Sequence, residues 1–103
     1  MRPADVRENG SACVWVALPV GRNGWASRPA TLHYEGTRLV KADGIDMLQA
    51  GPNGMTGILY LVKESLCRDD RRVLRVERQR VVDGRITATQ NWGEVEDAGP
   101  LAA

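Results

Sequence analysis

The chain has 103 residues, 43% of them hydrophobic, which is enough to bury a core in one domain without disulfides or a structural metal. Its 14 basic and 13 acidic side chains leave a formal net charge of +1, which excludes the strong positive bias of a generic nucleic-acid coat. We therefore expect a single domain over residues 1–103, with residues 1–10 and 94–103 flexible and any electrostatic recognition confined to a local patch.

The N-terminal segment carries charges where a signal peptide would need an apolar run. No apolar stretch approaches the length of about 20 residues that a membrane-spanning helix requires. We expect a cytoplasmic protein with no membrane partner.

The first predicted element is a strand over residues 12–18, which is apolar on both alternating faces and ends at Pro19. A connector rich in turn residues follows and contains Asn23-Gly24 and Trp25. An exposed Trp25 would favour stacking or an interface, whereas an indole folded back would cap the core.

A short hairpin is predicted around Glu35-Gly36. A two-residue loop there places Tyr34 opposite Thr37 and leaves His33 opposite Arg38, pointing away from the apolar cluster. Residues 42–57, with four glycines and a proline, then indicate a long loop with one helical turn at residues 45–49. Residues 58–62, the most hydrophobic run, predict an internal strand.

The clearest element is a hairpin about Asp83-Gly84, since this dipeptide supplies the two positive-φ positions of a type I′ turn. Counting outward with a two-residue loop gives two faces. The predicted solvent face holds Val76, Arg78, Arg80, Val82, Arg85, Thr87, Thr89 and Asn91. The predicted core face holds Val73, Val81, Ile86, Ala88 and Trp92, with Arg75 stacked on Trp92. A bend is predicted at residues 68–71.

These elements predict an all-β protein, either a small barrel or two packed antiparallel sheets of five to six strands. Exposed strand edges allow a homodimer, but no symmetry follows from the sequence.

Few residues carry catalytic chemistry. His33 is the one histidine and could act with Asp43 or Asp46 across a bend, but a surface histidine is the more frequent situation. Cys13 and Cys67 lie in apparent strands and are expected to be buried free thiols, with a disulfide left open. No spacing is typical of a metal or phosphate loop, so no cofactor is expected.

Binding chemistry is better supported. Residues 68–85 hold seven arginines and four acidic side chains, whereas residues 93–103 hold three acidic side chains and no basic one. Guanidinium groups match phosphate or carboxylate, and threonine hydroxyls add neutral donors. We expect a small non-enzymatic binding module whose candidate residues are Arg78, Arg80, Arg85, Thr87, Thr89 and Trp25. The sequence does not decide between a protein and a nucleic-acid partner, and the acidic tail could itself cover the arginines.

One alternative comes from a resemblance. Residues 14–19, a glycine-bearing loop and residues 26–32, with Arg28-Pro29 at the start of the second strand, resemble the opening of MazF/PemK-type barrels. The resemblance covers about a fifth of the chain. It implies an RNA-cleaving barrel and nominates Arg28 as a site residue.

Overall fold

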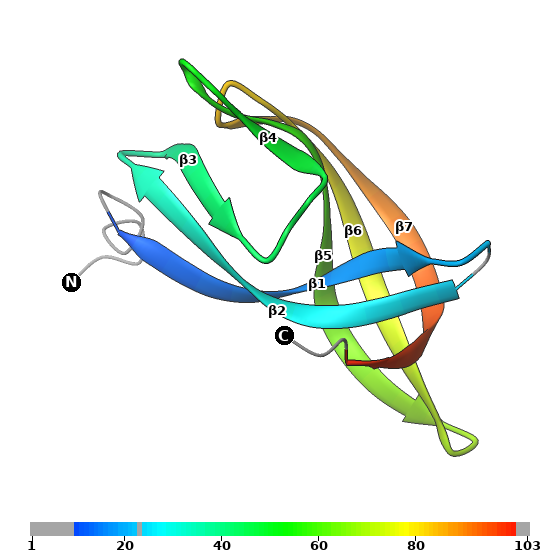
Figure 1. The fold of residues 1–103 in the computed structure, drawn as a ribbon. Coiled ribbons are helices and arrows are strands. Elements are labelled where there is room, and N and C mark those ends of the chain that lie inside the picture. Colours follow the sequence, from blue (N-terminus) through cyan, green and yellow to red (C-terminus); the bar gives the residue numbers. More distant parts are fainter. Residues whose placement is uncertain (1–9, 23, 101–103) are drawn as a thin grey trace.

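The computed structural model describes residues 10–22 and 24–100, and the regular structure within them is entirely β-strand (Figure 1). The strands are β1 (Ser11–Val20), β2 (Gly24–Glu35), β3 (Arg38–Asp43), β4 (Leu48–Gly51), β5 (Gly54–Arg68), β6 (Arg71–Val82) and β7 (Arg85–Pro100). The predicted all-β class is therefore confirmed. The described residues hold seven strands, one more than the upper end of the predicted range.

Five of the strands close into a ring. The sheet runs β1-β2-β7-β6-β5, and β5 returns to β1 through the pairing of Leu61 with Val16. The pairing of β2 with β7 is parallel, at Trp25 with Asp97 and Ser27 with Pro100, and the other pairings are antiparallel. In Figure 1 the β1–β2 pair crosses the long β5–β6–β7 sheet. The fold is thus a mixed sheet that closes partly into a ring, which is compatible with both predicted architectures, a small barrel or packed sheets.

Two hydrophobic clusters lie on opposite faces of β6. Leu74 and Val76 pack inside the ring with Ala17, Trp25 and Tyr60. Because side chains alternate along a strand, the odd-numbered Val81 belongs to the other face. There it joins a larger cluster that β3, β4 and the segment between them help to cover, made of Val16, Ala30, Leu32, Leu39, Ile45, Leu48, Met55, Leu59 and Val81.

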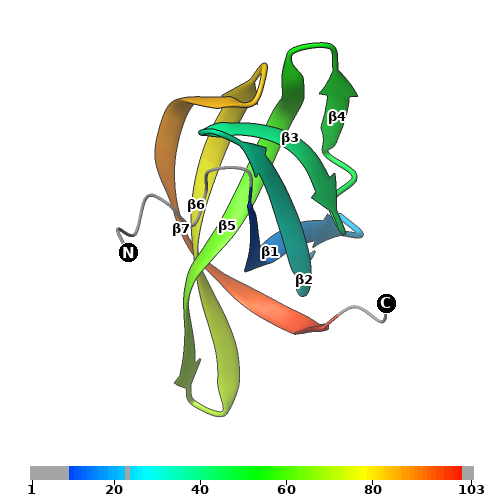
Figure 2. The same cartoon turned by 90° about the vertical axis from the view of Figure 1, so that its left-hand side faces the viewer.

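Both predicted turns of the long hairpins are confirmed. Asp83 and Gly84 have φ values of 50° and 81°, as a type I′ turn requires. Asp69 and Asp70, at 50° and 62°, form the bend between β5 and β6. The tip of that second hairpin projects away from the rest of the molecule in both views (Figures 1 and 2).

Residues 42–57 are not a long loop, and they contain no helical turn. β3 extends to Asp43, and residues 48–51 form β4, which turns directly into β5. The predicted apolar component of this segment does pack, since Ile45, Leu48 and Met55 are buried. The glycines that suggested a loop instead allow close strand contact: a Cβ on Gly57, whose φ is +151°, would lie 2.1 Å from the Met47 carbonyl oxygen.

The hairpin near residue 35 is displaced by one residue from its predicted position. Gly36 and Thr37 form the turn, so Glu35 faces Arg38 and Tyr34 faces Leu39. His33 lies opposite Lys41, not Arg38, because the turn comes one residue later and Val40 is an extra residue between these pairs.

The register of β7 is the main correction to the predicted hairpin. Val82 faces Arg85 as expected, but Thr87 and Trp92 are bulged residues that have no partner in β6. Each bulge shifts the pairing by one position. The predicted faces also fail at Ile86 and Trp92, which are 56% and 41% exposed, and at Val76, which is only 1% exposed, whereas Val81 is buried as predicted.

The C-terminal segment and the two cysteines also differ from their predicted states. Residues 94–100, expected to be flexible, continue β7 and pair with β6 and β2. Residues 1–9 and 101–103 lie outside the described residues, as does Asn23 of the predicted Asn-Gly reversal. The prediction of buried thiols is wrong, because Cys13 and Cys67 are both exposed and free.

Candidate functional site

Arg78 and three aromatic side chains lie close together at the edge of the ring of strands. Trp25 packs edge-on against Tyr60 with centroids 5.0 Å apart, and Tyr60 packs edge-on against Trp92 at 5.6 Å. The guanidinium carbon of Arg78 lies 5.7 Å from the Trp92 ring centroid. Trp25 is half-buried in the inner cluster, so it caps the core, whereas Trp92 offers an exposed indole.

The face of β6 that is buried in the ring continues outward as the candidate site. From Val76 the same face runs to Arg78, which is half-buried, and to Arg80, which is exposed. Tyr60 of β5 and Gln90 of β7 lie directly opposite Arg78 in the two neighbouring strands. We call Arg78, Arg80 and Arg85 the arginine face, since Arg85 lies across from Val82 on this same side.

Arg38, which the sequence pattern does not predict as a site residue, also belongs to this surface. It lines a shallow hollow of about 360 Å³ together with Arg85 and Thr87. The β2–β3 turn contacts the β6–β7 turn, where the Leu39 amide donates a 2.9 Å hydrogen bond to the Gly84 carbonyl. This contact places Arg38 beside Arg85. No local signal marks this residue, since the two turns are far apart in the sequence.

The two predicted threonines are placed differently. Thr87 is the bulged residue, and its hydroxyl donates a 3.3 Å hydrogen bond to the Arg80 carbonyl. Thr89 lies opposite Gln79, on the face away from the arginines. The predicted grouping of Thr89 with Arg78 is therefore wrong.

The acidic residues of β7 neutralise other arginines. Glu94 forms ion pairs with Arg68 and Arg75, and Arg75 also pairs with Glu64 at 2.9 Å. The hydrogen bond from Arg75, together with the charge and hydrogen bond of Arg68, lowers the pKa of the Glu94 carboxyl. The predicted stacking of Arg75 on Trp92 is thus replaced by these ion pairs, and Arg78 lies over the indole instead.

A further ion pair lies near the tip of the β5–β6 hairpin, where Arg71 Nη1 is 3.6 Å from Glu96 Oε2. By contrast, Arg78, Arg80 and Arg85 form no ion pair within residues 10–22 and 24–100. The Nε of Arg78 is also buried without a hydrogen-bond partner in this part of the chain. The possibility that the acidic tail covers the arginine face is therefore not realised among the described residues.

The histidine lies elsewhere. His33 Nε2 is 2.9 Å from Asp43 Oδ2, and this hydrogen bond lowers the pKa of the Asp43 carboxyl. Both side chains are substantially exposed to solvent. Arg28 and His33 lie five positions apart on the regularly paired part of β2, so they face opposite sides of the strand. The two residues considered for RNA cleavage do not form one site.

The described part of the chain offers neither a metal centre nor a membrane-spanning helix. It contains no group of three or more histidine, cysteine or acidic side chains that could hold a metal ion. It also contains no helix long and apolar enough to cross a membrane.

No protein-family model, no curated protein and no solved structure matches this chain. Its function must therefore be argued from its own geometry.

Proposed function

We propose that this protein is a small non-enzymatic binding module that engages single-stranded nucleic acid through the arginine face and Trp92. The observation that carries the proposal is the sorting of charge along the β6–β7 hairpin. Glu94 and Glu96 form ion pairs with Arg68, Arg71 and Arg75. The arginines of the arginine face form no ion pair within the described residues.

A guanidinium group matches the geometry of a phosphate oxygen pair and is weakly hydrated, so unpaired arginines suit a sugar-phosphate backbone. Arg38 beside Arg85 adds a further cation to the same surface. This local concentration of charge suits a protein whose net charge is only +1.

The exposed indole favours a single strand over a duplex. Trp92 is held by its bulge, where the Gly93 amide donates a 3.0 Å hydrogen bond to the Asn91 side chain, and by the edge of Tyr60. A rigid, part-exposed indole offers a surface for an unpaired base, and such stacking contributes about 1–3 kcal/mol per base. A base paired in a duplex cannot reach it.

The test is fluorescence anisotropy with a labelled oligonucleotide of about ten nucleotides. For three phosphate contacts on a single strand, the logarithm of the association constant should fall against the logarithm of salt concentration with a slope of about −2. The double variant Arg80→Glu/Arg85→Glu should abolish binding. The matched control Arg68→Glu/Arg71→Glu makes the same change of charge at two exposed arginines that are already paired, and it should retain binding.

Two results would contradict the proposal. One is salt-independent binding, which would indicate a protein partner that depends on the aromatic residues instead. The other is equal loss of affinity in the control variant, because binding would then follow total charge and not the arginine face. Release of shorter RNA fragments would favour the cleaving-barrel alternative.

A further inference from the structure

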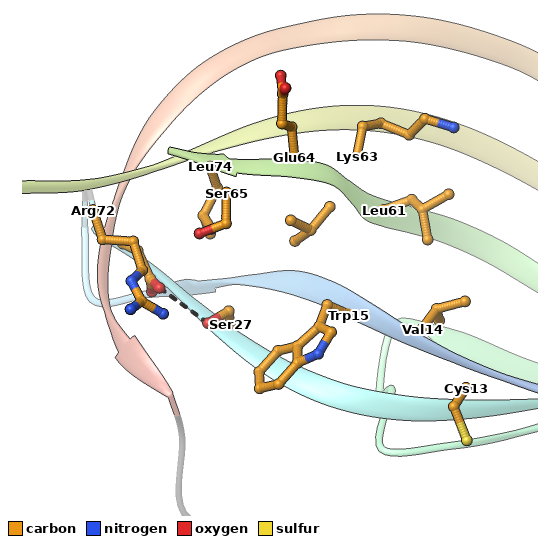
Figure 3. Close-up of a pocket in the computed structure, with 12 residues that line it drawn as sticks. Cys13, Val14, Trp15, Ser27, Leu61, Lys63, Glu64, Ser65, Arg72 and Leu74 are labelled. Atoms are coloured by element: carbon orange, nitrogen blue, oxygen red, sulfur yellow. Dashed lines mark hydrogen bonds between the residues drawn. The ribbon is translucent and has the colours of Figure 1, made fainter. Parts of the chain in front are cut away.

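A cleft of about 580 Å³ opens on another part of the molecule, where the ring is incomplete. β1 and β5 pair only at Val16 and Leu61 within the described residues. On the N-terminal side of Val16 the two strands separate, and the cleft lies between residues 13–15 of β1 and residues 61–65 of β5 (Figure 3).

Both walls of this cleft are strand edges. Residues 13–15 pair with β2 on one side, and residues 64–66 pair with β6 on one side. Lys63 is a bulged residue that interrupts the β5–β6 register. Backbone N–H and C=O groups along an unpaired edge can accept an additional strand, which is how extended peptides bind many sheets.

The side chains between these edges offer an apolar surface with a cationic rim. Figure 3 shows Val14 on β1 facing Leu61 on β5 across the opening, whereas the indole of Trp15 is turned away from β5. Trp15 is 48% exposed although it is a large hydrophobic residue. Lys63 is exposed and forms no ion pair within the described residues, whereas Glu64 beside it is already paired with Arg75. Two further charged residues line the cleft: Arg72, and Asp97, whose carboxylate accepts a hydrogen bond from Ser27. Both acidic side chains are thus engaged and Lys63 is not, so the unsatisfied charge beside β5 is positive.

We infer that this cleft binds an extended segment of another protein, which adds as a strand along the β1 or β5 edge. Its apolar side chains lie against Val14 and Leu61, and an acidic side chain lies toward Lys63. The site is separate from the arginine face, so the protein would connect a nucleic acid with a protein partner.

The test uses a labelled peptide of about seven residues that alternates valine and glutamate, measured by fluorescence anisotropy with the whole chain. We expect saturable binding, and Lys63→Glu should weaken it by about tenfold. The same variant should gain binding of a peptide that alternates valine and lysine. Lys41→Glu, at an exposed lysine on β3, is the matched control and should change neither affinity.

A second peptide tests the strand itself. Methylation of all its backbone nitrogens removes the N–H donors along both edges of the peptide while keeping its side chains, and it should abolish binding. Undiminished binding of the methylated peptide would overturn strand addition. Failure of the unmethylated peptide to bind at millimolar concentration would overturn the inference, as would a self-association that Lys63→Glu dissolves.

Peptide binding by the cleft can be tested separately from the proposed nucleic-acid binding. The variant Arg80→Glu/Arg85→Glu should lose the oligonucleotide and keep the peptide. If it loses both, the peptide occupies the arginine face and the assignment to the cleft is wrong.

Discussion

The guanidinium group of Arg78 lies over the indole of Trp92, 5.7 Å from its centroid, although the two residues are fourteen positions apart and were predicted to face opposite sides of the hairpin. The bulge at Thr87 produces this contact, because the extra residue brings the even-numbered residues of β7 that follow it to the side of β6 that holds Arg78. The same contact joins the arginine face to the aromatic residues at the rim of the ring.

A double-mutant cycle should detect this contact. The variants Arg78→Ala and Trp92→Ala, alone and combined, should give a coupling free energy of unfolding of about 0.5–1 kcal/mol at this part-exposed site. Urea denaturation provides the values. The pair Arg80→Ala and Trp92→Ala is the control, and coupling as large in that pair would show that the cycle reports general charge effects.

Gly84 should not tolerate a side chain. Its φ is +81°, and a Cβ there would lie 2.3 Å from Arg38 Cγ and 2.7 Å from the Leu39 carbonyl oxygen. We expect Gly84→Ala to cost more than about 2 kcal/mol of unfolding free energy. Gly21→Ala is the control, since Gly21 has a φ of +61° but open space around its Cβ position, and only the backbone penalty of about 1–2 kcal/mol should appear. Equal losses in the two variants would mean that the turn contact contributes nothing.

The two faces of β6 can be told apart by truncating valines. Val76→Ala removes two buried carbons from the inner cluster and should lower the unfolding free energy by about 2 kcal/mol. Val82→Ala, at a position that is 38% exposed, should change it by less than about 0.5 kcal/mol. The reverse ranking in denaturant unfolding would restore the face assignment made from the sequence.

Acid should loosen the distal end of the β6–β7 hairpin. Arg75 and Arg68 hold the pKa of Glu94 below its ordinary value of 4.5 in the folded protein. A lowered folded pKa contributes stability that is present above the unfolded value and is lost as pH falls through the folded one. Stability should therefore decline below pH 4.5, and Glu94→Gln should be less stable at neutral pH and decline less on acidification.

Thermal unfolding at several pH values would measure this. Glu35→Gln is a matched control, because Glu35 is exposed and forms no ion pair within the described residues. If the stability of Glu35→Gln declines as little on acidification as that of Glu94→Gln, Glu94 is not the source of the decline.

Local chemistry was sufficient for the class of fold and for its sharpest turns. Asp83-Gly84 can adopt positive φ at two successive positions, and alternating apolar residues without helical periodicity restrict the chain to strands. The same reasoning placed Arg78 and Arg80 on one side of β6, because alternation within one strand follows from the backbone alone. The two-residue turn then placed Arg85 of β7 on that side, opposite Val82.

Tertiary structure decided which side chains complete that set. The bulge at Thr87 moved Thr89 away and brought the indole to Arg78, and a bulge depends on how the whole strand must bend to close a ring. Arg38 reached Arg85 through contact between two turns, and Glu94 reached Arg68 and Arg75 through the pairing of β7 with β6. A one-residue shift inverts every facing beyond it, so a pattern that counts residues from the turn can give the strands but cannot give their partners once a bulge intervenes.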